Sequence, residues 1–369
     1  MDTPNPSLSF PYSQAPAYGT TLEVAEGVRW LQMPLPMSLN HINLYLLEDT
    51  HGWTIVDTGI RGEETRDLWH KIINSELNGK PVTRIICTHM HPDHTGQAGF
   101  LSEVCKAPLY MSYSEYYQAR VMSSMMREDG GWHMSAYFER AGVSHEFLEK
   151  MREARSHFRQ QEEDKPLPAS YIRLVDGEKL SIAGREWEVI TGTGHSPEHV
   201  CLYCKDLRIL ISGDQVLPVI TSNVSVQPTE PYADPMTGWL ESIDKFRELI
   251  PNDTLVLPAH NAPFYGIQER LQELREHHED RMLVLEENCV KPAKAIDLLP
   301  FLFKRELTDY SLFMALGECI AHLHCLMKKN KIERLLADGV YLYKSIDPTL
   351  KYRARPGQHE EPDDAPEMV

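Results

Sequence analysis

The chain has 369 residues, of which 42% are hydrophobic, and a formal net charge of −17. This length suffices for one large α/β domain and a smaller module, and no run of about 18 uncharged apolar residues is present to span a membrane. The acidic balance argues against a nucleic-acid partner, because binding to a phosphate backbone gains its affinity from lysine and arginine.

The most informative segment is Thr88-His89-Met90-His91-Pro92-Asp93-His94, which follows an apolar, β-branched stretch at 82–87 that predicts a buried strand. Imidazole nitrogens and carboxylate oxygens are ligands that zinc, iron and manganese accept. Gly96 and Gly99 lie just beyond, in a segment that should open a helix. Side chains on a strand-to-helix loop can converge on one point, whereas along a regular strand they alternate between faces. The segment therefore predicts a metal site.

Residues 112–168 come next and predict a helical insertion. Tyrosine and methionine crowd its first half, and its charged second half has the pattern of an amphipathic helix. Folded over the metal site, the insertion would form a lid with an adaptable apolar lining, and Met126 and Trp132 are then candidate substrate contacts. The alternative is an ordinary helical hairpin that packs its own apolar stripe.

Three single ligand candidates follow later in the chain. They are His195, Asp214 and His260, which follow the predicted apolar strands at 187–190, 208–213 and 254–259 respectively. A lone histidine or aspartate at a strand end is more often a cap or a hydrogen-bonded structural residue. Ligands gather at strand ends in layered α/β folds, however, and together with the first cluster this set predicts a second metal ion.

Two polar residues near these strand ends are candidates for contact with a substrate. Asn223 lies in the segment after Asp214 and is a candidate oxyanion donor, with a plain turn role as the alternative. Tyr265 follows His260 closely in the sequence, which makes its phenol a candidate group near the leaving group.

The ordered ligand set resembles the metallo-β-lactamase-fold hydrolase superfamily, and the glyoxalase II and lactonase branches are nearest in ligand type. The resemblance covers about Leu22 to His278, and Ile55-Val56-Asp57-Thr58-Gly59 resembles the early strand motif of that superfamily. It implies a four-layer αββα sandwich in the α/β class that holds two divalent metal ions. One ion would be bound by His89, His91 and His195, the other by Asp93, His94 and His260, and Asp214 would bridge them.

The chemistry of two neighbouring divalent metal ions follows from their combined positive charge. Two divalent ions about 3.5–4 Å apart share a water and lower its pKa toward neutrality, which supplies a bridging hydroxide as the nucleophile. Zinc is the first expectation, and iron or manganese accept the same ligands. Asp214 and Asp93 are the catalytic candidates, with Asp93 placed to orient the hydroxide or carry a proton. Asp57 and His199 are candidates for orienting the ligands from behind, with turn roles as the alternative.

The C-terminal segment predicts two helices at 293–303 and 309–327 and a hairpin that turns at Asp338-Gly339. This order resembles the winged-helix module that trails some members of the superfamily, with His322 and His324 in the recognition-helix position. We expect the module to buttress the catalytic domain or to form a homodimer, and contact with nucleic acid is the alternative.

The predicted boundaries and location complete the organisation of the chain. Residues 1–20 are expected to form a mobile tail without signal-peptide features, and 349–369 a second, acidic mobile tail. The catalytic domain is placed at 21–288 and the winged-helix-like domain at 289–348. Seven scattered cysteines, an odd number, are typical of free thiols and of a cytoplasmic protein without a membrane span.

The leading functional prediction is a binuclear metal-dependent hydrolase that cleaves a carbonyl ester of a small neutral or apolar acyl substrate. A thioester of the glyoxalase II or acyl-thioester kind comes first, and a lactone or carboxylic ester second. The antibiotic-degrading branch often has cysteine at the position of Asp214, so antibiotic hydrolysis is not expected. The alternatives are a phosphodiesterase or endoribonuclease that uses the same metals, and a metal-binding regulator without turnover.

Overall fold

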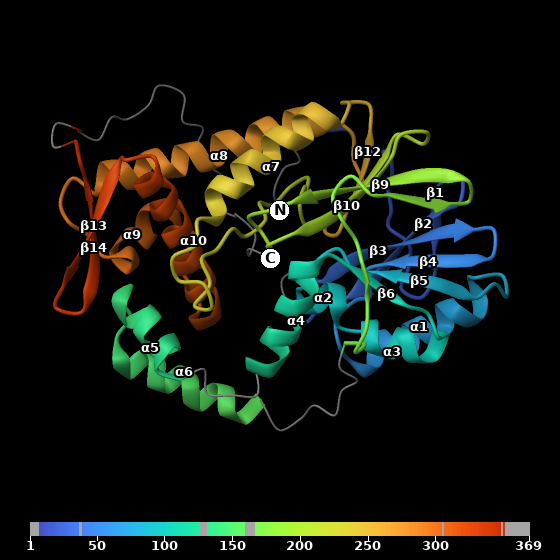
Figure 1. The fold of residues 1–369 in the computed structure, drawn as a ribbon, viewed down its shortest axis with the longest axis horizontal. Helices are drawn as coiled ribbons and strands as arrows, with labels where there is room; N and C mark the ends of the chain where they lie inside the picture. The colour runs from blue at the N-terminus through green and yellow to red at the C-terminus, as the bar shows by residue number, and fades with distance from the viewer. Residues whose placement is uncertain are drawn as a thin grey trace.

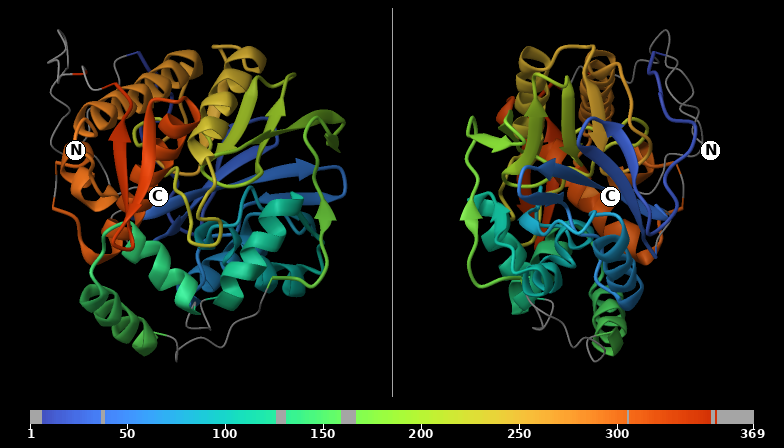
Figure 2. Two further views of the ribbon diagram at one scale, coloured as in Figure 1. Left: turned by 60° about the vertical axis from the view of Figure 1, so that its left-hand side comes forward. Right: turned by 90° about the vertical axis from the view of Figure 1, so that its right-hand side faces the viewer.

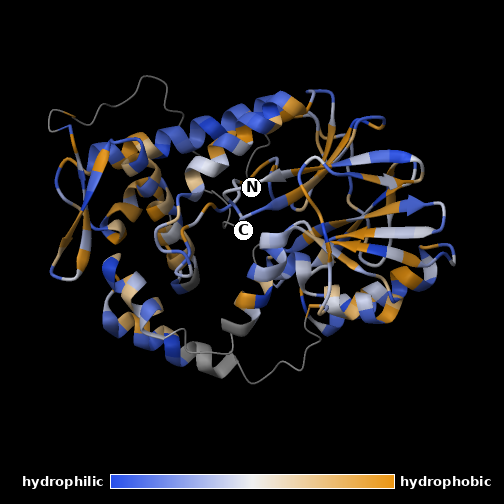
Figure 3. Ribbon diagram, in the orientation of Figure 1, coloured by the Kyte–Doolittle hydropathy of each residue, from blue (hydrophilic) through white to orange (hydrophobic). Residues whose placement is uncertain are grey.

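The computed structural model describes residues 7–36, 39–125, 131–158, 167–304, 306–347 and 350. Two β-sheets pack face to face, and helices cover the outer face of each sheet (Figures 1 and 2). The predicted four-layer αββα sandwich is confirmed. In Figure 3 the strands contain many apolar residues, whereas the long helix α8 is mostly hydrophilic on the side that faces the viewer.

The first sheet has seven strands in chain order, antiparallel from β1 to β4 and parallel from β4 to β7. They are β1 (Leu22–Ala25), β2 (Val28–Pro34), β3 (His41–Asp49), β4 (Gly52–Val56), β5 (Val82–Ile86), β6 (Leu109–Met111) and β7 (Ile172–Arg173). The parallel arrangement brings the carboxyl ends of β4 and β5 to the same edge, where the His89–His94 loop begins.

The second sheet has five strands in the order β12-β11-β10-β9-β8, of which only the pair β11 and β12 is parallel. They are β8 (Lys179–Ile182), β9 (Arg185–Gly192), β10 (His199–Cys204), β11 (Ile209–Gly213) and β12 (Leu255–Pro258). Between the sheets lies an apolar core that includes Trp30, Tyr45 and Trp187. Burial of these large rings fixes how the sheets sit on each other, and so where their strand ends meet.

The outer layers consist of helices with one apolar side. Helices α1 (Glu63–Ser75) and α3 (Ala98–Cys105) pack on the first sheet through residues such as Trp69 and Leu101. Helices α7 (Pro235–Leu249) and α8 (Ile267–Asn288) pack on the second sheet through Trp239 and Leu271. Asp234 begins α7 by accepting a hydrogen bond from the amide of Thr237, with proline next in the first helical position.

The predicted helical insertion is present as α4 (Tyr113–Met125), α5 (Gly131–Arg140) and α6 (His145–Phe158). Helix α5 contacts two other parts of the chain. The hydroxyl of Tyr137 donates to the carbonyl of Val226 in the segment before α7, and Phe138 contacts Phe313 of α10 edge-on. Its role as a lid stays a prediction. Met126 lies outside the described residues.

The C-terminal segment forms α9 (Ala295–Leu302), α10 (Asp309–Lys328) and the hairpin of β13 (Ile332–Ala337) and β14 (Val340–Ser345). The predicted turn at Asp338-Gly339 is confirmed, and both residues have positive φ, as a two-residue hairpin turn requires. His322 and His324, the residues in the predicted recognition-helix position, lie on α10 and are buried. The winged-helix assignment itself stays a prediction.

The apolar core of the second sheet continues into this C-terminal segment. One cluster joins Trp239 and Leu285 beneath α7 and α8 to Leu298, Leu316 and Tyr343 of the C-terminal elements. The carbonyl of Cys289 accepts the amide of Ser345, which ties the end of α8 to the end of the hairpin. The predicted boundary at 288/289 is therefore not a break in the packing.

The N-terminal segment corrects one expectation. From Ser7 onward the predicted mobile tail lies on the fold, because Ser9 pairs through its backbone with Tyr265 and the Tyr12 hydroxyl donates to the carbonyl of Val24. Leu8 is buried in the core under α8. Residues 1–6 and 351–369 lie outside the described part of the chain. No helix among the described residues is long and apolar enough to cross a membrane.

Candidate metal centre

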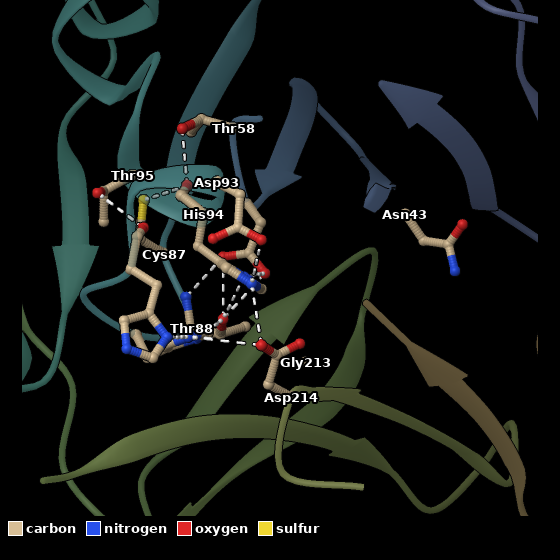
Figure 4. A network of polar contacts seen from close by, with 12 residues as sticks. Asn43, Thr58, Cys87, Thr88, Asp93, His94, Thr95, Gly213 and Asp214 are labelled. Atoms are coloured by element: carbon tan, nitrogen blue, oxygen red, sulfur yellow. Dashed lines mark hydrogen bonds and ion pairs between the residues drawn. The ribbon is translucent and has the colours of Figure 1, made fainter. Parts of the chain in front are cut away.

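The first ligand segment turns sharply after β5. The short helix α2 (Pro92–Thr95) starts with proline at its first position and follows His91, which is still extended. This switch from strand to helix turns His89, His91, Asp93 and His94 toward the ends of β10, β11 and β12 in the second sheet. Figure 4 shows Asp93 and His94 on α2 facing Asp214, which follows β11.

The structure brings all seven predicted ligands together in two groups. His89, His91, His195 and Asp214 form one, and Asp93, His94 and His260 the other; within each group one ligand atom per residue lies within 4.8 Å of the rest. Asp214 reaches both groups, since Oδ2 lies 3.4 Å from Nε2 of His195 and 3.5 Å from Nε2 of His94. Its other oxygen lies 3.5 Å from Nε2 of His260. The division matches the one that the resemblance implied.

Several buried atoms in these groups have no hydrogen-bond partner. Nε2 of His94, Nε2 of His260 and both carboxylate oxygens of Asp214 are enclosed, and they form no hydrogen bond within the described part of the chain. Buried polar atoms without partners are costly, and native proteins rarely leave them so. Cations among these atoms would satisfy all four, and imidazole with carboxylate is a donor set that divalent metals accept. The residues present thus fit a binuclear metal site.

Hydrogen bonds from behind hold the ligand rings in place. Nδ1 of His94 lies 2.8 Å from Oδ2 of Asp57, while Oδ1 of Asp57 accepts the amide of Thr88 at 2.7 Å. Asp57 has a left-handed backbone with φ of 62°, a conformation that aspartate tolerates better than most residues. Nδ1 of His195 lies 2.8 Å from the carbonyl of Asn223. Each contact leaves Nε2 of the ring directed at the cluster.

His199 lies directly beneath the cluster. Its ring stacks on that of His89 with centroids 4.7 Å apart, and its Nε2 accepts the amide of Asp214 at 3.1 Å. Gly213 is needed here, because it has φ of 51° and a Cβ would come within 2.6 Å of the His199 ring. His199 therefore positions Asp214 by accepting a hydrogen bond from the Asp214 backbone.

Replacing Asp57 by asparagine is expected to weaken metal binding by about 10- to 100-fold, because the amide no longer orients and polarises His94 as a carboxylate does. Competition with a chromophoric chelator would measure this affinity. Asp253→Asn removes an exposed carboxylate that pairs with Arg208, and it serves as the control. Equal affinities for both variants would show that Asp57 has no such role.

Charge in the cluster explains the directions of its pKa shifts. Burial lowers the pKa of His91 to about 3 and holds that of His89 well below its ordinary value. For His94 and His260 the effect of burial is offset by neighbouring carboxylates, so that their pKa values are raised. The pKa of Asp214 is depressed despite burial, chiefly by His260 and His94. Divalent cations would replace the protons on these two histidines, so metal binding should release protons.

Comparison with known proteins agrees with this geometry. Residues 38–260 match the family described as the metallo-beta-lactamase superfamily, and residues 283–346 match the metallo-beta-lactamase-like C-terminal domain. The chain belongs to the metallo-beta-lactamase superfamily. The region that matches the superfamily contains all seven predicted ligands, and its last residue is His260.

A solved beta-lactamase domain protein from Burkholderia ambifaria is 40% identical to this superfamily member, with a TM-score of 0.84 over 92% of this chain and 98% of that one. A linear primary-alkylsulfatase from a Pseudomonas species is 23% identical over 67% of this chain and 46% of that protein. The acyl-coenzyme A thioesterase MBLAC2 of Gallus gallus is 22% identical over 69% of this chain and 84% of that protein.

Three of the four candidate substrate contacts lie in the described part of the chain, and their role as substrate contacts stays a prediction. Asn223 is adjacent, but its carbonyl faces His195 and its amide group donates to Glu318, so it is not placed as an oxyanion donor. Tyr265 is 37% exposed and pairs with the N-terminal segment. Trp132 is 69% exposed at the start of α5, where it stacks on His133. Met126 lies outside the described residues.

Glu115 on α4 is a site residue that the sequence did not reveal. Its buried carboxylate accepts the amide of Met90 at 2.9 Å, the hydroxyl of Ser196 at 2.6 Å and the amide of Glu198 at 2.7 Å. Glu115 therefore joins the loop that carries His89 and His91, and the loop that carries His195, to the first helix of the insertion. Burial raises the pKa of Glu115 to about 7. A lone glutamate in a tyrosine-rich helix gives no sequence signal for this role.

Asn43 on β3 fixes the last ligand in a similar way. Nδ2 of Asn43 donates to the backbone carbonyl of Pro258 at 2.9 Å, and its side-chain oxygen Oδ1 accepts from the indole N–H of Trp30 at 2.9 Å. Nδ1 of His260 lies 3.1 Å from the carbonyl of His41 on the same strand. The first sheet thus holds a ligand that belongs to the second. The sequence separation of more than 200 residues concealed this contact.

A second buried carboxylate, Glu318 on α10, connects the C-terminal part of the chain to the metal ligands. Nδ2 of Asn223 donates to it at 3.2 Å, and the carbonyl of Asn223 faces Nδ1 of His195. His278 and His322 lie beside it, with ring nitrogens 3.1 Å apart. Burial raises the pKa of Glu318 to about 7.

This shift predicts a pH dependence that Glu318→Gln should remove. Folded protein keeps the proton of Glu318 to about pH 7, whereas unfolded chain releases it near pH 4.5, so the free energy of unfolding should fall as pH rises across this window. The shift corresponds to about 3 kcal/mol. Denaturant unfolding of metal-free wild type and variant at several pH values would measure the difference. Parallel curves for the two proteins would contradict the prediction.

Proposed function

We propose that this protein is a binuclear metal-dependent hydrolase that cleaves a carbonyl ester, with an acyl thioester as the first substrate class. The observation that carries the proposal is the group of buried, unpaired ligand atoms on His94, His260 and Asp214. The match to the superfamily supports metal-dependent hydrolysis, and the resemblance to a thioesterase, although distant, favours a thioester.

The described residues of the cluster differ in their exposure to solvent. His89, His94, His260 and Asp214 are fully buried, whereas the side chain of Asp93 is 12% exposed and His91 is partly exposed. A substrate would therefore approach between His91 and Asp93. Bound divalent ions there supply Lewis acidity toward the substrate carbonyl and a lowered pKa for water. Asp93 is the one carboxylate of the cluster that can exchange a proton with the solvent side, and we assign it proton transfer to the leaving group.

Zinc is the metal that we propose first, because three imidazoles with a shared carboxylate suit it, with iron and manganese as alternatives. We place the protein in a reducing compartment such as the cytoplasm, because all seven cysteines are free and six of them are buried. A small neutral or apolar acyl substrate fits the acidic chain better than a nucleic acid.

The proposal is tested by hydrolysis of a matched panel by the zinc-loaded protein. The panel contains an acyl-coenzyme A thioester, an acyl-homoserine lactone, an aryl ester, an alkyl sulfate and bis(p-nitrophenyl) phosphate. Preferential turnover of the thioester is expected, and preference for the lactone or aryl ester would keep the reaction but change the substrate class. Activity confined to the phosphodiester or the sulfate ester would refute the proposal.

A further inference from the structure

A cavity away from the metal ligands is lined by positive and phenolic side chains. It lies where α5, the segment before α7, α10 and the β13–β14 hairpin meet, and it is partly open to solvent. The side chains that matter are Arg140, Arg334, His324, Tyr232, Tyr341 and Tyr343. None of the residues that line it is acidic, although the chain has 54 aspartates and glutamates against 37 lysines and arginines.

The two guanidinium groups lack the partners that arginines normally find in an acidic protein. Within the described part of the chain, neither Arg140 nor Arg334 forms an ion pair with a carboxylate. Arg334 instead lies over the rings of Tyr341 and Tyr232, with its central carbon 4.3 and 5.2 Å from their centroids. Arg140 lies 5.7 Å from the centroid of Tyr341. A guanidinium has five N–H donors at its edge, so stacking on a ring and one or two hydrogen bonds to neighbours leave further donors for an anion.

Neighbouring groups fix these side chains before any ligand binds. Nδ1 of His324 donates to the carbonyl of Ala233 at 2.8 Å, which leaves its Nε2 to accept from Nη1 of Arg334 at 3.1 Å. The hydroxyls of Tyr232 and Tyr341 lie 3.3 Å apart. The pKa of Tyr232 is lowered by the hydrogen bond with Tyr341 and by the two arginines, which indicates a positive local field. Preorganised donors of this kind lower the entropic cost of binding.

We propose that this cavity is a binding site for an oxyanion, namely a phosphate or carboxylate group carried by a small molecule. Arginine forks and phenol hydroxyls match the oxygens of both groups, and arginine can bind either through two parallel hydrogen bonds. Tyr232 is 61% exposed at the rim, so the remainder of such a molecule would extend into solvent. The site is separate from the proposed hydrolase chemistry and does not depend on it.

Calorimetric titration of the zinc-loaded protein with inorganic phosphate and with acetate tests the site. One equivalent of at least one anion should bind to wild type and equally to Asp214→Asn, in which the metal centre is altered. Arg334→Gln should weaken this binding by about tenfold or more, since a charge-assisted pair is lost. The anion that binds more tightly identifies the ligand as a phosphate or a carboxylate.

Two further variants keep the test decisive. Arg185→Gln removes one positive charge at a surface pair with Glu26 and should leave anion binding unchanged. Arg140→Gln should weaken binding as Arg334→Gln does, and it replaces that variant if Arg334→Gln fails to fold. Absence of binding at millimolar concentrations, loss of binding in Asp214→Asn, or an equal effect of Arg185→Gln would each overturn the proposal.

Discussion

Asp214→Asn is expected to abolish nearly all hydrolysis and to lower the metal content from two equivalents to one or fewer. Both oxygens of Asp214 are buried without hydrogen-bond partners, and they face ligands of both groups. An amide offers one neutral oxygen in place of two charged ones. Loss of several kcal/mol of charge stabilisation, at about 1.4 kcal/mol per factor of ten, corresponds to a rate decrease on the order of 10³-fold.

Elemental analysis of the dialysed protein and initial rates on the best panel substrate would measure both effects. Asp253→Asn should keep the metal content and the rate of wild type, because the carboxylate of Asp253 is exposed and pairs with Arg208 at the surface. An Asp214→Asn protein that retained two equivalents of metal and full activity would show that the bridging assignment is incorrect.

Glu115→Leu is expected to destabilise the protein by about 3–5 kcal/mol. The carboxylate of Glu115 accepts from Met90, Ser196 and Glu198, and all three contacts are enclosed. Leucine would leave two backbone amides and a hydroxyl without acceptors, each at about 1–3 kcal/mol, although the hydroxyl can rotate to relieve part of its cost. Metal affinity should fall as well, because Met90 and Ser196 are adjacent to the ligands.

Denaturant unfolding with and without zinc would separate the two effects. Glu115→Gln keeps a carbonyl oxygen as acceptor and should lose less than half as much stability. Glu248→Leu, at an exposed position on α7, serves as the surface control. If Glu115→Leu were as stable as Glu248→Leu, the three hydrogen bonds would not hold the ligand loops.

The ligands were predictable because each is a reactive residue type at the end of an apolar strand. His89 to His94 form a local pattern, and His195, Asp214 and His260 each follow a stretch whose β-branched residues predict a strand. The parallel pairing of β4 with β5 and of β11 with β12 then brings these ends to one edge, as in other layered folds. The strands and the ligand set were therefore predictable from local sequence patterns.

The residues that orient the ligands were harder to find, because their partners are distant in sequence. Asp57 was recognised only through the motif that contains it. Glu115, Asn43 and Glu318 act through hydrogen bonds to groups that are distant in sequence, such as the amide of Met90, the carbonyl of Pro258 and the side chain of Asn223. Neither residue type nor spacing distinguishes such a side chain from a solvent-facing one. The direction of Asn223 likewise depends on α10, which a reading of local sequence does not place.

The apolar core that runs from α7 and α8 into α9, α10 and the hairpin has a consequence for how the chain can be divided. A protease cut after α8 should yield two fragments that elute together, because separation would expose Leu285, Leu298 and Leu316 to water. A synthesised C-terminal fragment would have no folded state of its own to adopt. Recombination between relatives at this point would join surfaces that had not been selected to fit each other. The catalytic region and the C-terminal segment are therefore expected to evolve together as one unit.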